Sequence, residues 1–366
     1  MKQLLKGIIS ILIPLFILSS CAQVGKPIFA LNSDIQHIQN GHMLLEKKNY
    51  ALAKSEFEKA STINKYSFQP YMGLAVVYLR QNKLNEAYDE LKKALKAART
   101  NKEKIKVKSG FIQYYSSHEF IKRHHGKNAW FVMSEETFMD VEKIGKSNEV
   151  YYYMARAYCM DFKFDKARKL LKRIQKTQNP FTLLASEELK KIDIVEKLSK
   201  KYEKTKGIIF SPVLTKEILS YILIDIFNIQ EKIKRKTNVK YTSKDTINSE
   251  YLESISQIIN LNIKGLLPYE DRTFRPNKRV TRADLAVVLY DIYKKGTGKK
   301  FAGKSEVTYS DIDKGNWFAD SVAFVTNYRI MNEEDSLTME FRPFDNLTVL
   351  NTLNILDYFF TDIVIL

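Results

Sequence analysis

The chain has 366 residues, 45% of them hydrophobic, and a formal charge of +17. This length predicts two or three domains, and the apolar fraction is ample for ordinary hydrophobic cores. The positive charge favours anionic partners such as phospholipid headgroups, acidic wall polymers or nucleic acid. Cys21 and Cys159 are the two cysteines, so the domains are expected to fold without a disulfide framework.

The first 20 residues have the layout of an export signal. Lys2 and Lys6 precede an apolar run over residues 7–18, which is well short of the ~20 residues that a membrane-spanning helix requires. The next four residues, Leu-Ser-Ser-Cys21, resemble the lipobox of bacterial lipoproteins. The resemblance implies cleavage before Cys21, acylation of its thiol and a lipid anchor in a membrane. An ordinary signal cleaved near Ala22, or an uncleaved anchor, is the alternative.

An exported chain makes nucleic acid the weakest of the three anionic partners. Removal of Lys2 and Lys6 with the leader lowers the formal charge from +17 to +15, so the mature chain stays basic. The predicted location is the cell envelope. Ala22 stands where many lipoproteins of the inner membrane carry aspartate, which favours the outer membrane facing the periplasm if two membranes exist, and the cell surface otherwise.

A repeat of 34 residues begins near position 41. Gly41, Leu44, Tyr50, Ala53, Phe57 and Ala60 recur by residue class as Ala75, Tyr78, Leu84, Ala87, Leu91 and Ala94. The segment resembles the tetratricopeptide repeat, which implies a solenoid of helical hairpins that binds a protein partner. A third copy runs from Tyr151 to Ile174 and contains Cys159, which the apolar pattern predicts to be a buried thiol.

Residues 101–147 separate the second copy from the third. They hold either a degenerate unit with an insertion or an irregular excursion. His118, His124 and His125 lie there without acidic or cysteine partners at ligand spacing, so we expect a solvated turn and no metal site. Two basic stretches, 92–108 and 163–176, form either a surface for an anionic partner or the solvated outer faces of helices.

The C-terminal part contains a second internal repeat. Phe274-Arg275-Pro276 with Thr281-Arg282-Ala283-Asp284 resembles the S-layer homology domain, and Phe341-Arg342-Pro343 with Thr348, and Phe210-Ser211-Pro212 with Thr215, are further copies. Thr215, Thr281 and Thr348 are 66 and 67 residues apart. The resemblance implies a pseudo-threefold, mostly helical bundle whose grooves bind polysaccharide of the cell wall.

The predicted organisation is all-α. It comprises a signal peptide (1–20), a lipidated tether (21–32), a tetratricopeptide-like helical-hairpin solenoid (33–206) and a module similar to the S-layer homology domain (207–366). The module has three degenerate units at about 207–240, 241–300 and 305–360, and the first lacks a convincing N-terminal half. Thr281 and Asp284 are placed to form the N-terminal cap of a helix.

The resemblance assigns the glycan-binding positions. Arg282 is expected to be exposed beside the helix start, where a guanidinium holds an acidic sugar. The remaining predicted glycan contacts are Thr281, Lys216, Asp245, Asp311 and Trp317. The third unit has Val349 in place of the arginine, and the glycine-rich turn is altered, with Arg272 in one copy and Glu333, Glu334 and Asp335 in another.

These features predict a non-enzymatic envelope lipoprotein that joins a membrane and a protein partner to an acidic wall glycan or peptidoglycan, and that needs no cofactor or metal. An assembly factor with a purely structural module is the first alternative. A wall-modifying enzyme is the second. No catalytic order of Ser, His and Asp or pairing of Cys and His emerges, and all five histidines precede residue 126.

Overall fold

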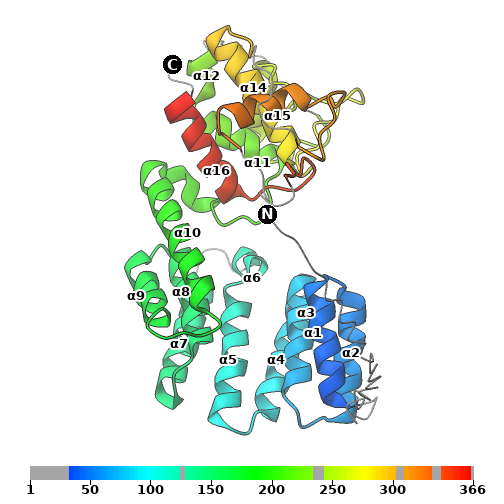
Figure 1. The fold of residues 1–366 in the computed structure, drawn as a ribbon, viewed down its shortest axis with the longest axis vertical. Helices are drawn as coiled ribbons and strands as arrows, with labels where there is room; N and C mark the ends of the chain where they lie inside the picture. The colour runs from blue at the N-terminus through cyan, green and yellow to red at the C-terminus, as the bar shows by residue number, and fades with distance from the viewer. Residues whose placement is uncertain (1–32, 124–127, 234–242, 302–308, 332–338, 364–366) are drawn as a thin grey trace, which may run out of the picture.

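The computed structural model describes residues 33–123, 128–233, 243–301, 309–331 and 339–363. Within these ranges the secondary structure is helical, with two isolated backbone bridges and no strand, so the predicted all-α class is confirmed. Figure 1 shows an arched row of helices below and a compact bundle above. Cys21, the signal peptide and the tether lie outside the described residues.

The arched row is the helical repeat segment. The predicted hairpins are present as α1 with α2, α3 with α4, and α8 with α9. Its helices are α1 (Asp34–Glu46), α2 (Tyr50–Ile63), α3 (Gln69–Arg80), α4 (Leu84–Ala97), α5 (Asn101–Tyr115), α6 (His118–Arg123), α7 (Ala129–Ile144), α8 (Asn148–Met160), α9 (Phe164–Ile174) and α10 (Thr182–Lys201). Helices α5 and α7 pack together with the short α6 between them, so residues 101–147 are a helical pair with an insertion.

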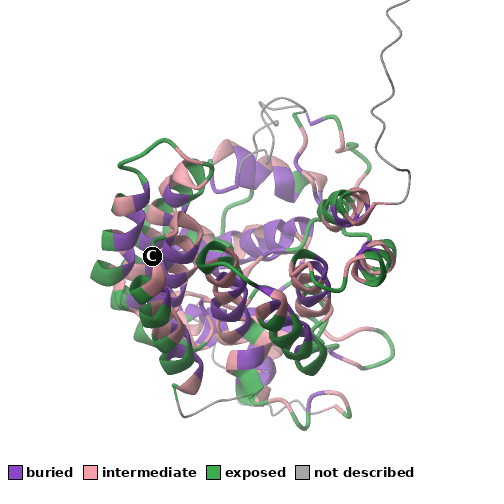
Figure 2. Cartoon of the chain, turned by 90° about the horizontal axis from the view of Figure 1, so that it is seen from below, coloured by how far each residue is buried: buried purple, intermediate pink, exposed green. Residues whose placement is uncertain are grey.

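Small residues allow the repeat helices to approach closely. The ring of Phe57 fills the space left by Gly41 and Gly73, where an added Cβ would lie 2.6 Å and 2.4 Å from its Cε1 atom. The alanines of the repeat pattern are buried: Ala53, Ala60, Ala75, Ala87, Ala94, Ala155 and Ala167. Figure 2 shows that buried residues lie on the helix faces turned toward neighbouring helices and that exposed residues lie on the outer surface.

About half of the basic residues in the two lysine-rich stretches have acidic partners inside the solenoid. Lys106 pairs with Glu149 at 2.6 Å and Lys108 with Asp140 at 3.0 Å, and both pairs link α5 to another helix. Arg168 on α9 pairs with Asp193 on α10 at 2.7 Å. These stretches therefore cross-link helices, and much of their charge is balanced locally.

Cys159 is buried, as predicted, and burial raises the pKa of its thiol to about 12. Such a thiol is protonated at neutral pH and is a weak nucleophile. His118 lies at the start of α6, whereas His124 and His125 fall outside the described residues. Of the residues that are described, no three His, Cys, Asp or Glu side chains gather as a metal site would require.

The upper bundle is the C-terminal module. It contains α11 (Lys216–Tyr221), α12 (Ile229–Ile233), α13 (Leu252–Asn260), α14 (Arg282–Thr297), α15 (Ala319–Asn327) and α16 (Val349–Tyr358), with short 3₁₀ or π segments at Glu203–Gly207, Ile222–Ile226 and Phe359–Ile363. Between residues 33 and 363, no described helix has the length and apolarity to cross a bilayer.

Three backbone hydrogen bonds close the module into a ring. The amide of Leu214 donates to the carbonyl of Leu347 at 2.9 Å, that of Val280 to Leu214 at 2.9 Å, and that of Leu347 to Val280 at 3.3 Å. Each of these residues immediately precedes one of the three repeated threonines. The three copies are therefore related by a pseudo-threefold arrangement around this triangle.

Helix α10 belongs to both parts of the molecule. Around the ring, α13 packs against α11 and α15 against α14, while α16 packs against α10 (Figure 1). The last helix of the repeat row thus takes the place of the missing N-terminal half of the first unit. Asp357 of α16 is 1% exposed and binds Lys197 and Lys201 of α10 at 2.7 Å and 2.6 Å.

We expect Ala87→Trp to destabilise the repeat row. Ala87 is fully buried in α4, and overpacking of this kind costs about 1 to 3 kcal/mol or more. Thermal unfolding measures the effect, with Asn85→Trp as the control because Asn85 is exposed on the same helix. Equal melting temperatures for the two variants would contradict the packing of α4.

Candidate functional site

Each repeated threonine begins a helix of the ring. The hydroxyl of Thr281 accepts the amide of Asp284 at 3.2 Å, and the Asp284 carboxylate accepts the amide of Thr281 at 3.0 Å. This is the predicted capping box. The hydroxyls of Thr215 and Thr348 likewise accept an amide at the starts of α11 and α16, without the reciprocal carboxylate bond. These threonines therefore fix the direction in which each helix leaves the ring.

The residue after the threonine is buried in each copy, which corrects the expectation that Arg282 is exposed. Arg282 is 5% exposed, its Nε donates to the carbonyl of Phe341 at 2.7 Å, and its guanidinium lies 4.5 Å from the centre of the Phe341 ring. The sequence places Arg282 beside a helix start, but it does not reveal that the next unit folds over it. The guanidinium is used to join two units of the ring.

Lys216 occupies the equivalent place one unit earlier and is 4% exposed. Its Nζ donates to the carbonyls of Phe274 and Leu267 at 2.9 Å and 3.2 Å and lies 4.2 Å from the centre of the Phe274 ring. Burial, with the nearby positive charge of Lys278, lowers its pKa to about 8. Val349 takes this place in the third copy and is fully buried.

Asp245 and Asp311 organise the turns that receive these cations. Asp245 accepts the amides of Phe274 and Arg275 at 3.3 Å and 2.6 Å, and Asp311 accepts those of Phe341 and Arg342 at 2.9 Å and 2.7 Å. Although burial opposes it, the hydrogen bonds from Ser243 and these amides lower the pKa of Asp245. Each Asp thus binds the amide of a phenylalanine whose carbonyl binds Lys216 or Arg282.

The two turn arginines have an unusual backbone that the sequence alone did not suggest. Arg275 and Arg342 have φ of 58° and 55°, in the left-handed region that non-glycine residues seldom adopt. Arg272, which replaces the glycine of the family's turn, has φ of 61°. Arg272 therefore occupies a backbone conformation that glycine adopts more readily. Glu333, Glu334 and Asp335 lie outside the described residues.

Trp317 is the predicted contact that stays on the surface. It is 59% exposed, and its ring packs edge-on against the buried Phe318, 5.3 Å between centroids. Phe344, 71% exposed, also packs edge-on against Phe318, 5.8 Å between centroids. An exposed aromatic face of this kind is suited to stacking on a sugar ring.

Two cavities lie beside helix starts of the ring. One, of about 320 Å³, lies between the start of α11 and the Pro276 turn and is lined by Glu217, Lys244, Asp245, Asn248, Ser249, Glu250, Pro276 and Asn277. The other, of about 570 Å³, lies between α10, the Pro212 turn and the start of α16. Of the predicted glycan contacts, Asp245 lines the first cavity, while Lys216 and Arg282 are enclosed behind the turns.

The fold and these turns define a class: a helical repeat row joined to a ring of three helix-start motifs. Residues 44–106 match the family model described as tetratricopeptide repeat, and residues 266–286 match that described as S-layer homology domain. The chain thus carries a tetratricopeptide repeat, a type that suggests protein interaction. It also carries an S-layer homology segment, which indicates association with the cell envelope or cell surface. No curated protein matches it.

Removal of Arg282 tests its structural role. We expect Arg282→Ala to lower the free energy of unfolding by about 1.5 to 3 kcal/mol, because the buried carbonyl of Phe341 loses a charged donor. Arg279→Ala is the control, since Arg279 is exposed three residues earlier and should change stability by less than about 0.5 kcal/mol. Chemical denaturation measures both, and equal stability of the two variants would show that the guanidinium does not hold the ring.

The lowered pKa of Lys216 predicts how the free energy of unfolding changes with pH. The unfolded lysine titrates near 10.5 and the folded one near 8, so the unfolded state binds more protons between these values. The contribution of Lys216 to stability should therefore rise between pH 8 and pH 10.5. The free energy of unfolding of the parent minus that of Lys216→Met should grow over this window and stay level below it. A flat or falling difference would contradict the burial of a charged amine.

Proposed function

We propose that this protein is a lipid-anchored envelope protein that holds a protein partner on its repeat row at a fixed position relative to the cell wall. The lipid is carried by Cys21, the wall polymer binds the grooves of the ring, and the protein has no enzymatic activity. The observation that carries the proposal is the shared helix α10, because it joins the two binding parts without a flexible linker.

The ring supports wall attachment through its surface. Its turns are covered by polar and charged side chains around a cavity, and Trp317 offers an exposed ring. Hydroxyl-rich sugars are recognised by such combinations of hydrogen-bonding groups and apolar faces. The cations of the motif are occupied inside the ring, so the proposal assigns polymer binding to the grooves and not to Arg282 or Lys216.

The contact between α10 and α16 supports a rigid connection. The carboxylate of Asp357 is almost completely enclosed and also accepts the hydroxyl of Tyr202 at 2.8 Å. A buried carboxylate is costly unless its partners stay in place, so separation of α10 from α16 is opposed by the loss of three charged or polar contacts. A partner bound to the repeats is then held at a set distance from the wall.

A non-enzymatic role is supported by the state of Cys159, the cysteine that lies in the described part of the chain. The Cys159 thiol is enclosed and protonated, with a pKa of about 12. A nucleophilic cysteine requires an accessible thiolate near neutral pH. The thiol instead fills space in the core of the repeat row.

The anchor and the wall contact are separable by one substitution. Cys21→Ser should abolish labelling by a radioactive fatty acid and release the protein from membranes, because the thiol is the acyl acceptor. The released protein should still sediment with purified wall sacculi.

The matched control is Cys159→Ser, which removes the buried thiol and leaves the proposed lipid site intact. Fatty-acid label on the Cys21→Ser protein would refute the anchor. Failure of the parent chain to sediment with sacculi would refute the wall contact. Sacculi stripped of secondary polymers then show whether peptidoglycan or an attached polymer is bound.

A further inference from the structure

The larger cavity of the ring lies where the repeat row meets the module. It is lined by the start of α16, by the segment Ile209, Phe210, Ser211 and Pro212, and by α10 and Arg156 of α8. The cavity at the start of α11 is built alike, with Glu217 in the place of Leu350 and Pro276 in the place of Pro212. The junction cavity is therefore the counterpart of that groove, with repeat helices forming one wall.

Among the described residues, the helix start in the junction cavity has one backbone hydrogen bond fewer than the other two. The amide of Val349 donates to the carbonyl of Ser211, but the next amide lacks a counterpart of the bond made at the other two helix starts. In α11 the amide of the second residue, Glu217, donates to the carbonyl of Pro276 at 3.1 Å. In α14 the amide of the second residue, Ala283, donates to the carbonyl of Pro343 at 2.9 Å. The turn of the first unit is two residues shorter, because Pro212 is three residues before Thr215 whereas Pro276 is five before Thr281. Within the described part of the chain, the amide of Leu350 has no acceptor. An amide of this kind is able to bind an anion.

Basic residues of the repeat row line this cavity, whereas the motif cations of the other two copies are enclosed inside the ring. Arg156, Lys190 and Lys191 line it, with Glu187 as the acidic residue among them. Lys191 lies 3.7 Å from Glu188, but neither Arg156 nor Lys190 pairs with a carboxylate of the described residues. This contrasts with the cross-helix pairs of Lys106, Lys108 and Arg168. The unpaired charges therefore face the junction.

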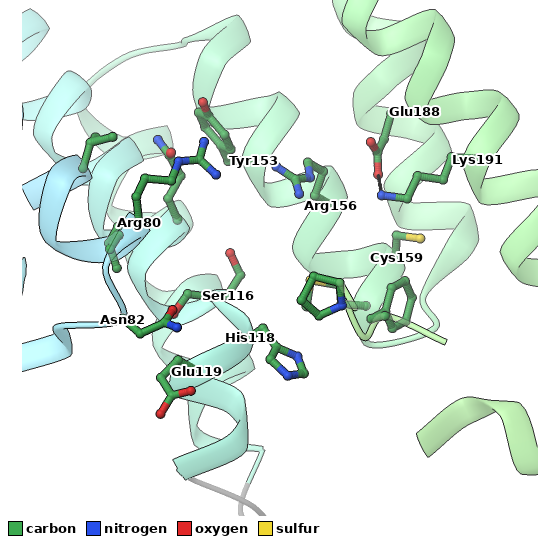
Figure 3. A pocket seen from close by; sticks show the side chains of 17 residues that line it. Arg80, Asn82, Ser116, His118, Glu119, Tyr153, Arg156, Cys159, Glu188 and Lys191 are labelled. Atoms are coloured by element: carbon green, nitrogen blue, oxygen red, sulfur yellow. Dashed lines mark ion pairs between the residues drawn. The ribbon is translucent and has the colours of Figure 1, made fainter. Parts of the chain in front are cut away.

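A second cavity, of about 340 Å³, continues from the first and shares Arg156, Lys191, Phe210 and Pro212 with it. Figure 3 shows Arg80 and Arg156 turned toward the space between them, with Tyr153 nearby and Lys191 paired with Glu188 on the other side. Glu119, which also lines this cavity, is bound to Arg123 at 3.0 Å. The positive lining thus extends from Lys190 on α10 through Arg156 on α8 to Arg80 at the end of α3.

We propose that this junction is a composite binding site for a carboxylate-bearing saccharide of the cell wall. Arg156 and Lys190 hold the carboxylate, the open amide of Leu350 contributes a further donor, and the amides of Asn351 and Asn354 with the hydroxyl of Ser211 meet the sugar hydroxyls. The proposal rests on the wall-binding function above and adds that the repeat row itself contributes to polymer recognition.

A saccharide fits the lining better than an acidic peptide does. The groups at the start of α16 are short neutral amides and hydroxyls, which both donate and accept hydrogen bonds, as sugar hydroxyls require. Phe210 and Pro212 supply an apolar surface for the face of a sugar ring. A peptide held by charge alone would not need the amides of Asn351 and Asn354.

The test uses the full mature chain, soluble wall-polymer fragments released from sacculi, and the same fragments with their carboxylates converted to amides. Isothermal titration should show that the parent binds the untreated fragments about tenfold or more tightly than the amidated ones. The double variant Arg156→Gln/Lys190→Gln should lose about tenfold or more in affinity for the untreated fragments only. The control Lys169→Gln/Lys172→Gln makes the same charge change on the exposed side of α9 and should bind as the parent does.

The outcomes separate this inference from the proposed function. If the parent fails to sediment with sacculi, the wall-binding function is wrong. If the parent sediments and binds fragments but both double variants bind equally well, the junction site is wrong and the other grooves carry the attachment. Competition by a Glu-rich peptide at equal affinity would also overturn the saccharide assignment. Should the double variant melt early, Lys190→Gln alone is used, because Lys190 is exposed and a change there leaves the core intact.

Discussion

The contact between α10 and α16 is the constraint on which both parts of this molecule depend. A ring of three units needs three paired helices, and the first unit does not supply its own. Helix α10 fills that place while its other side packs against α9, so the repeat row and the ring share one element of their cores. The enclosed carboxylate of Asp357, held by Lys197, Lys201 and Tyr202, fixes the position of α10 because any separation would leave a buried charge without partners.

The family motif in this chain acts chiefly in folding. Thr281 and Asp284 cap a helix, Arg282 crosses to the next unit, and Asp311 holds the turn that receives it. Lys216 and Asp245 repeat the arrangement, and Val349 fills the third place with an apolar side chain. A position that accepts lysine, arginine or valine is one in which packing against the next turn matters more than charge. Ligand recognition is therefore expected on the outer sides of the turns, where the grooves lie.

The distribution of charge follows the same logic. The chain has a formal charge of +17, yet many basic residues of the solenoid are paired with acids on neighbouring helices. Surface pairs of this kind contribute little stability each, but they remove positive charge from the outer face. Among the residues that the structure describes, Arg80, Arg156 and Lys190 have no such acidic partner, and they lie around the two joined cavities. Part of the positive charge that is not balanced by a neighbouring acid thus lies at the junction of the repeat row and the ring.

The sequence by itself determined the helical class, the repeat hairpins, the helix caps and the burial of Cys159. These depend on short-range periodicity and on residue types at fixed spacing, such as the alanines at 53, 60, 87 and 94. It could not determine that Arg282 is buried, because this burial depends on a turn 59 residues away. It could not determine that α10 packs against α16, because the Lys201–Asp357 contact spans 156 residues. The tertiary structure alone decided these, since it brings together segments whose separation along the chain leaves no local pattern to read.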